Sequence, residues 1–161
     1  MVYSLENKSG ADRNFFLSIS AKSDRKKSYS DLFLPSVEKA IERQEDRPLW
    51  GKADKFKVLK GKSLGERKFA YTRIKDGEKR LCVAVFNKFD PNAKNITIRV
   101  TGLSNDIEVI SDPGGRTLLR ERIRLIHLSR PGDEYEITND SFKNLRMEWR
   151  KESTEVKFKD E

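Results

Sequence analysis

Apolar and polar residues alternate along much of the chain, a pattern typical of strands that bury one face. Between Phe15 and Ala21 every second residue is apolar. The same period of two, together with a continuous apolar run at 81–86, predicts further strands. They are expected at residues 56–58, 69–74, 81–86, 96–100, 107–111 and 145–149. We predict that the run at 81–86 is a central strand buried on both faces, and that residues 145–158 form a C-terminal hairpin with a turn at 151–153.

Apolar residues spaced three or four positions apart predict a helix that begins near Pro35 and ends at Glu45. Proline is tolerated in the first turn of a helix, and Pro48 is expected to end the pattern. Ser30 is the expected N-cap, because its hydroxyl can accept a backbone N–H bond. The face expected to be buried holds Phe33, Val37, Ala40, Ile41 and Gln44.

The stretch from Thr117 to Leu128 fits two structures. Leu118, Leu119, Ile123 and Ile126 have helical spacing, whereas Ile123 and Leu125 also suit a strand. We favour the helix. Two helices packed on an antiparallel sheet of about five strands make an α+β fold. Residues 1–12 are polar and predict a flexible N-terminal arm, and residues 13–161 have the length of a single α+β domain.

Composition limits the chemistry that this chain can perform. It has 161 residues with one cysteine and one histidine, so it can form no intramolecular disulfide, cysteine-built zinc site or multi-histidine metal centre. His127 has apolar neighbours and Cys82 lies in the most apolar strand, so both are interpreted as structural residues. We therefore expect a non-enzymatic, cytoplasmic protein with no cofactor and no small-molecule substrate. A nuclease-like protein that depends on His127 is kept as an alternative.

Lysine and arginine number 34 against 26 acids, a net charge of +8, and the excess is clustered. A tight turn at residues 22–27 and a second segment at 52–68 hold most of the excess positive charge. A third group, the four arginines at 116–124, is partly offset by Glu121. Crowded cations favour an anionic partner, although lysines that guard an edge strand against aggregation would give the same pattern at 55–57. The predicted polyanion contacts are Lys22, Arg25, Lys26, Lys27, Lys52, Lys55, Lys57 and Lys60. The charge alone does not distinguish an acidic membrane surface from a nucleic acid.

Three features follow one another in the first third of the chain: the strand Phe15-Phe16-Leu17-Ser18-Ile19, a basic linker with Arg25, and the sequence Ser28-Tyr29-Ser30-Asp31. In this order of features, residues 13–60 resemble the rhabdovirus matrix proteins. Lys55-Phe56-Lys57-Val58-Leu59 follows at the place of the next strand of that family. The resemblance implies a basic structural protein that self-associates and bridges a nucleoprotein–RNA complex to an anionic membrane, as a peripheral membrane protein and virion component. The chain lacks the proline-rich late-domain sequences of such proteins, so recruitment of host budding machinery is not implied.

A second resemblance covers residues 37–48, Phe69-Ala70-Tyr71-Thr72-Arg73 and the run 81–87. These segments look like the junction between the barrel and the C-terminal β-sandwich of α-amylase-type glycosidases. This resemblance implies a non-catalytic accessory domain, in which Trp50, Trp149 or Tyr135 would form a sugar platform. A basic RNA-binding protein outside both families is the remaining alternative.

Overall fold

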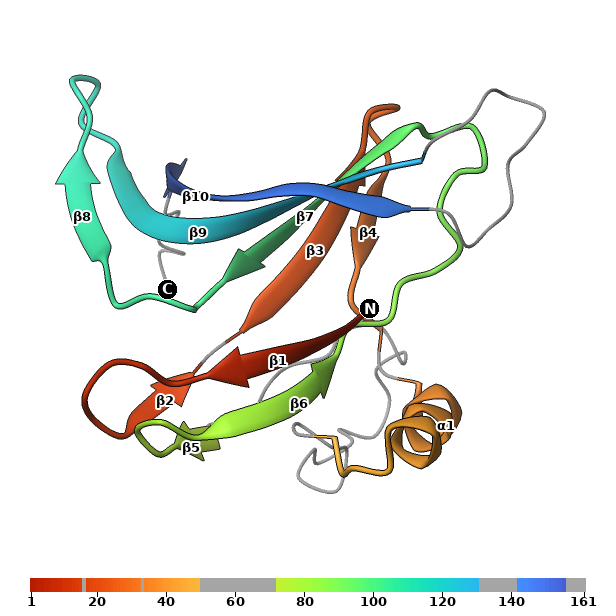
Figure 1. Cartoon of the computed structure of the whole chain (residues 1–161). Helices are drawn as coiled ribbons and strands as arrows, with labels where there is room; N and C mark the ends of the chain where they lie inside the picture. The colour runs from red at the N-terminus through yellow and green to blue at the C-terminus, as the bar shows by residue number, and fades with distance from the viewer. Residues whose placement is uncertain (16, 33, 50–71, 131–141, 156–161) are drawn as a thin grey trace, which may run out of the picture.

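The computed structural model describes residues 1–15, 17–32, 34–49, 72–130 and 142–155 (Figure 1). It is mostly β, with 51% strand and 9% helix, and the described part contains one helix. The predicted α+β fold with two helices packed on a sheet is therefore wrong. The predicted contacts Lys52, Lys55, Lys57 and Lys60 lie outside the described residues, as do the strand predicted at 56–58 and the segment 156–158.

The largest element is a six-stranded antiparallel sheet, drawn in the upper half of Figure 1. Its strands are β3 (Ser18–Ser23), β4 (Ser28–Ser30), β7 (Asn95–Thr101), β8 (Ile107–Ser111), β9 (Thr117–Ser129) and β10 (Lys143–Glu155). They lie in the order β10-β9-β7-β3-β4, and β8 pairs with the first part of β9 on the same side as β7. The long β10 therefore lies at one edge of the sheet and the short β4 at the other.

Two smaller antiparallel pairs lie below this sheet in Figure 1. One joins β1 (Val2–Glu6) to β6 (Lys79–Val83), and the other joins β2 (Arg13–Phe15) to β5 (Thr72–Ile74). Residues 2–6 are thus a paired strand, which corrects the expected flexible arm. The expectation of a central strand at 81–86 is wrong for the described chain, in which β6 pairs with β1 alone. The expected burial on both faces is confirmed at Cys82 and Val83, neighbours in β6 that are both fully buried.

The hydrophobic core lies between the six-stranded sheet and the smaller pairs. The predicted alternation is confirmed at Leu17, Ile19 and Ala21, which are all buried. They pack in one cluster with residues of β1, β5, β6 and β7. Cys82 is fully buried in this cluster, as expected of a core thiol.

Asn7 follows β1 and connects one end of the two smaller strand pairs through hydrogen bonds. Its side chain is completely buried, and Nδ2 donates to the carbonyl oxygens of Ala11 at 2.8 Å and Ile74 at 2.9 Å. Its backbone N–H donates to Glu78, and its carbonyl accepts from Gly77. Gly77 has a φ of +73° in the turn between β5 and β6, a conformation that glycine adopts readily. The two strands beside this turn pair with β2 and β1 and not with each other.

Helix α1 (Pro35–Glu45) begins and ends at the predicted residues. Its N-cap is Leu34, because Ser30 belongs to β4. The predicted apolar face is wrong in part: Val37 is exposed, whereas Glu38 is buried. The spacing of apolar residues located the helix but did not identify the side that packs.

The predicted second helix is strand β9, which pairs with β10 over its whole length and with β7 and β8 on its other side. Arg120, Arg122 and Arg124 alternate with residues of the opposite face, which is a period of two. The predicted C-terminal hairpin is also corrected, because β10 continues without a turn from Lys143 to Glu155. Backbone pairing on both sides of β9 decides between two structures that its apolar residues fit equally well.

Candidate polyanion-binding site

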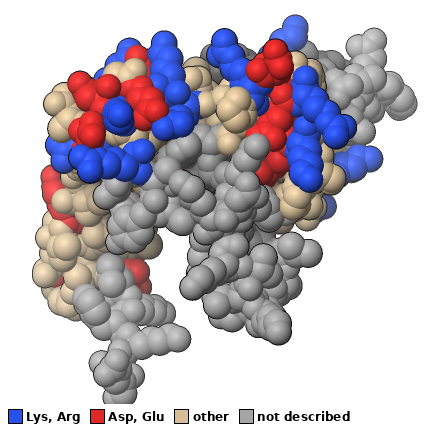
Figure 2. Space-filling model, turned by 90° about the horizontal axis from the view of Figure 1, so that it is seen from below, with Lys and Arg blue, Asp and Glu red and all other residues tan. Residues whose placement is uncertain are grey.

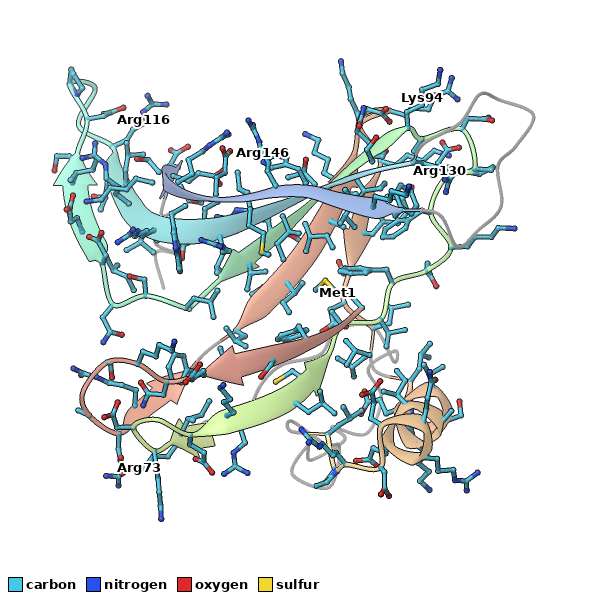
Figure 3. All side chains as sticks on the ribbon, viewed as in Figure 1. Met1, Arg73, Lys94, Arg116, Arg130 and Arg146 are labelled. Carbon is cyan, nitrogen blue, oxygen red and sulfur yellow. The ribbon has the colours of Figure 1, made fainter. Side chains whose placement is uncertain are left out.

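A row of polar side chains crosses the six-stranded sheet at the end where the β3–β4 turn lies. Lys22 lies opposite Ser28 on β4 and opposite Thr97 on β7. Thr97 lies opposite His127, which in turn lies opposite Arg146 on β10. Directly opposed residues of antiparallel strands point to the same face, so the row occupies a single face. Figure 3 shows Arg146 on the side of the sheet that faces away from β1 and β6, so this is the outer face.

The β3–β4 turn extends this row beyond the end of the sheet. It is closed by a hydrogen bond from the backbone N–H of Ser23 to the carbonyl of Lys27 at 2.9 Å. Lys26 takes a left-handed conformation with a φ of +63°, which a non-glycine residue adopts at a cost. Arg25 and Lys26 are both exposed, so the turn presents their charges to solvent.

Asp24 joins the turn to the β6–β7 connection, which is distant in sequence. Its Oδ2 accepts hydrogen bonds from the backbone N–H groups of Lys94 at 3.1 Å and Asn95 at 3.0 Å. Its own N–H donates to the carbonyl of Asn95 at 3.0 Å. These bonds place Lys94 beside the basic turn, on the outer side of the sheet (Figure 3).

Lys27 differs from its neighbours in the turn because it forms an ion pair. Its Nζ lies 2.9 Å from Oδ2 of Asp90, a carboxylate that is almost buried. The hydrogen bond from Lys27 lowers the pKa of Asp90, and the same bond raises the pKa of Lys27. Asp90 also accepts from the N–H of Asn92, and its own N–H donates to the hydroxyl of Tyr29. Lys27 therefore stabilises the turn at Asp90, and its charge is already compensated.

The other cations at this end form no ion pair with any described residue. These are Lys22, Arg25, Lys26 and Lys94, which we call the cationic end. The two nearest acids in sequence are engaged elsewhere, since Asp24 accepts backbone bonds and Asp90 pairs with Lys27. The arginines of the β8–β9 hairpin behave differently, because Arg116 pairs with Asp112 and Arg120 with Glu108. The structure thus brings three of the predicted contacts together and adds Lys94.

His127 belongs to a hydrogen-bonded group within the row. Its Nδ1 lies 3.3 Å from Oγ1 of Thr97, and its Nε2 lies 3.3 Å from Oε1 of Glu148. The contact with His127 is the main reason that the pKa of Glu148 is lowered, and Arg146 and Arg150 lower it further. A pocket of about 320 Å³ borders this group, lined by Asn95, Ile96, Thr97, His127, Leu128 and Arg146. Arg146 brings a cation to this lining, but its Nη2 lies 3.5 Å from Oε2 of Glu148, so that its charge is partly compensated.

Trp149 lies on the opposite face of the sheet, where Met147 opposes Ile126 and Ile126 opposes the core residue Ile98. The guanidinium carbons of Arg122 and Arg124 lie 4.9 and 5.1 Å from the centre of its ring. These cations lie over the indole, and Trp149 remains 42% exposed. Trp50 and Tyr135, the other expected platform residues, lie outside the described residues.

On the face that carries the two smaller sheets, the described residues form no patch of a single charge. Seen from that side, blue and red side chains are intermixed in both groups of charged residues (Figure 2). Among the described residues no three of histidine, cysteine, aspartate and glutamate gather as metal ligands. The one described helix is too short and too polar to cross a membrane.

Sequence reasoning missed Lys94, Thr97 and Arg146. Each is a single polar residue in or beside a strand, and its place in the site depends on strand register and on the bonds of Asp24. No local signal in the sequence identifies them. Comparison with protein-family models, curated proteins and solved structures finds no significant match to this chain.

Proposed function

We propose that this protein binds the phosphate backbone of a nucleic acid, and specifically of RNA, through the cationic end. The observation that carries the proposal is the convergence of four cations that form no ion pair with a described residue. Lys22 lies at the end of β3, and Arg25, Lys26 and Lys94 lie on two connections that Asp24 holds together. Cations held close together without acidic partners repel one another, and a polyanion relieves that repulsion. Binding driven by such cations releases counterions and therefore depends steeply on salt.

The neighbouring side chains favour the phosphate backbone of a nucleic acid over a membrane surface. Ser28, Thr97 and Asn95 place hydroxyl and amide groups beside the cations, and such groups bind phosphate oxygens together with lysine and arginine. The exposed large apolar residues of the described chain lie elsewhere, namely at Met1 and β1, on α1 with its N-cap, on β8 and on the opposite face of β10. A membrane would therefore be bound by charge alone, at about 1 kcal/mol for each cation near the surface.

The resemblance to matrix proteins points to the same ligand, since it implies contact with a nucleoprotein–RNA complex. It also implies an anionic membrane as a second partner, which the test below treats as a separate outcome. The segment 131–141, which connects β9 to β10, carries four acids and lies outside the described residues. Lys143 follows that segment, so the proposed site consists of Lys22, Arg25, Lys26 and Lys94 without Lys143.

The test is a titration of a fluorescent single-stranded RNA oligonucleotide, followed by anisotropy at several salt concentrations. A variant with K22Q, R25Q, K26Q and K94Q is expected to lose most of the affinity. Each lost phosphate contact reduces the slope of log K against log salt by about 0.7, so four contacts reduce it by about 3. The matched control is K8Q, R73Q, K75Q and K79Q, which removes the same charge from the side of the two smaller sheets.

Equal loss of affinity in both variants would show that net charge alone drives binding and would contradict the proposed site. A parallel sedimentation assay uses vesicles with equal amounts of phosphatidylcholine and phosphatidylserine. Vesicle binding that requires the cationic end, with no RNA binding, would replace RNA by the membrane as the ligand.

A further inference from the structure

The last described strand of the six-stranded sheet is long and pairs with a described strand on one side only. β10 covers 13 residues and pairs with β9, and no other described strand pairs with it. Its outer edge therefore presents a row of backbone N–H and C=O groups to which another strand can bind. Such an edge either carries features that prevent a further strand from pairing with it, or it is the binding site of a further strand.

The side chains of β10 are complementary to their own sequence read backwards from Trp149. The residues at equal distances on either side of Trp149 are Glu148 and Arg150, Met147 and Lys151, and Arg146 and Glu152. When two copies of β10 lie antiparallel with their Trp149 residues opposed, Glu148 faces Arg150 of the second copy, and Arg146 faces Glu152. Opposite charges that face each other across antiparallel strands stabilise the pairing. The symmetry produces each of these pairs twice.

The neighbouring registers lack this complementarity. A shift that keeps the faces of the sheet moves the centre from Trp149 to position 148 or 150. With the centre at 148, Glu148 faces its own copy and Arg146 faces Arg150. With the centre at 150, Arg150 faces its own copy and Glu148 faces Glu152. Like charges directly opposed are destabilising, so the charge pattern selects the register centred on Trp149.

The exposed apolar residues of β10 lie at the same centre. Met147 is 52% exposed and Trp149 is 42% exposed, on the face opposite the cationic row. In the Trp149-centred register the two indole rings meet across the two-fold axis, and aromatic pairs across strands stabilise a sheet. Arg122 and Arg124, which already lie over Trp149, would flank the pair in each copy.

We propose that this protein forms a two-fold symmetric dimer through the outer edge of β10, with Trp149 of each copy on the axis. The two six-stranded sheets then form one continuous sheet. The β-bulge between Asn144 and Arg146 limits the regular pairing to the residues that follow it. The dimer does not depend on polyanion binding, because the cationic end lies at the other side of the sheet, on β3 and the connections beside it.

The first test is sedimentation equilibrium of the wild-type chain and three variants. R150E places carboxylates opposite Glu148 twice in each dimer, and E148R places arginines opposite Arg150 twice, so each is expected to weaken dimerisation about tenfold or more. The double variant E148R/R150E restores opposite charges and is expected to recover most of that loss. A wild-type chain that is monomeric at the concentrations of the assay, or a double variant no better than R150E, would overturn the proposal.

Within its own chain Glu148 also contacts His127, Arg146 and Arg150, so charge reversal changes these contacts as well. A second test therefore uses W149C, which leaves the charges of the sheet in place. W149C is expected to form a disulfide-linked dimer under mild oxidation, because opposed Cα atoms lie within the span of a disulfide. In the same dimer each of E148C and R150C lies about 8 Å from its own copy, too far for a disulfide, whereas a mixture of the two variants cross-links. Self-linking of E148C and R150C as efficient as that of W149C would show a different register. Cys82 is fully buried and leaves the assay unaffected.

Discussion

Lys27 Nζ lies 2.9 Å from the carboxylate of Asp90, whereas Lys26, the next residue, points its charge into solvent. The two lysines are therefore expected to respond differently to the same substitution. K26Q should reduce the salt slope of RNA binding by about 0.7 and leave the melting temperature unchanged. K27Q should lower the melting temperature, because it removes the partner of an almost buried carboxylate, and should change the slope less. Equal slopes for the two variants would contradict the distinction.

Stability is expected to fall in acid. The pKa of Glu148 is lowered mainly by His127, that of Asp90 by Lys27, and that of Asp112 by hydrogen bonds from Arg116. A carboxyl whose pKa is lower in the folded state stabilises the fold above its unfolded pKa, and that stabilisation is lost as the pH falls through the folded value.

Urea unfolding measured from about pH 7 down to about pH 3 tests this expectation. The free energy of unfolding should begin to fall near the ordinary values of 3.8 for aspartate and 4.5 for glutamate, and should continue to fall below them. D112N should lower stability at neutral pH and reduce the decrease in acid. An unchanged acid decrease in D112N would show that the bonds from Arg116 do not stabilise the hairpin.

Arg99 holds together two carboxylates that oppose each other. Its Nη2 lies 3.0 Å from Oε1 of Glu121 and its Nε lies 2.9 Å from Oε2 of Glu152, and these acids face each other across β9 and β10. R99A should therefore cost about 1–3 kcal/mol of unfolding free energy at neutral pH, because both acids lose their partner. The cost should decrease in acid and in R99A/E152Q, which removes one of the two opposed charges. Thermal unfolding of the single and double variants measures both effects.

Substitutions of Asn7 are expected to lower the free energy of unfolding. N7A removes the donor to the carbonyl of Ile74 inside the protein, and an unsatisfied buried acceptor costs about 1–3 kcal/mol. N7D keeps the size of the side chain but lacks the amide donor, so it should destabilise the fold at least as much at neutral pH. S9A is a suitable control, because its hydroxyl bonds are exposed. If N7A and S9A unfold at the same denaturant concentration, Asn7 does not hold the end of the two smaller pairs.

Local signals were sufficient for several elements. Pro35 and the spacing after it located α1, and alternating residues located β7 and β8. The basic turn was also predicted, although Lys22 and Ser23, the first two residues of the predicted turn, belong to β3. In each case the information lies within a few residues of the element itself.

The remaining features depend on contacts between distant parts of the chain. The apolar residues of β9 suit a helix and a strand equally well, and pairing with β10 decides between them. Val2–Glu6 resemble a polar arm until β6 provides backbone partners. In the candidate site, Lys94 reaches the basic turn only through the hydrogen bonds of Asp24, which joins positions 70 residues apart. A pattern confined to one segment carries no information about such a contact.

The strand pairing also has a consequence for synthesis on the ribosome. β1 and β3 are made early. β1 has no partner until β6 is made, since Val2 pairs with Val83, and β3 has only the short β4 beside it until β7 is made, since Lys22 pairs with Ser28 and Thr97. At about 5–20 residues per second, β6 and β7 follow several seconds later. During that interval the apolar residues of β3 have no larger sheet to join, so a nascent chain that stalls before β7 should be a substrate for chaperones that bind exposed strands.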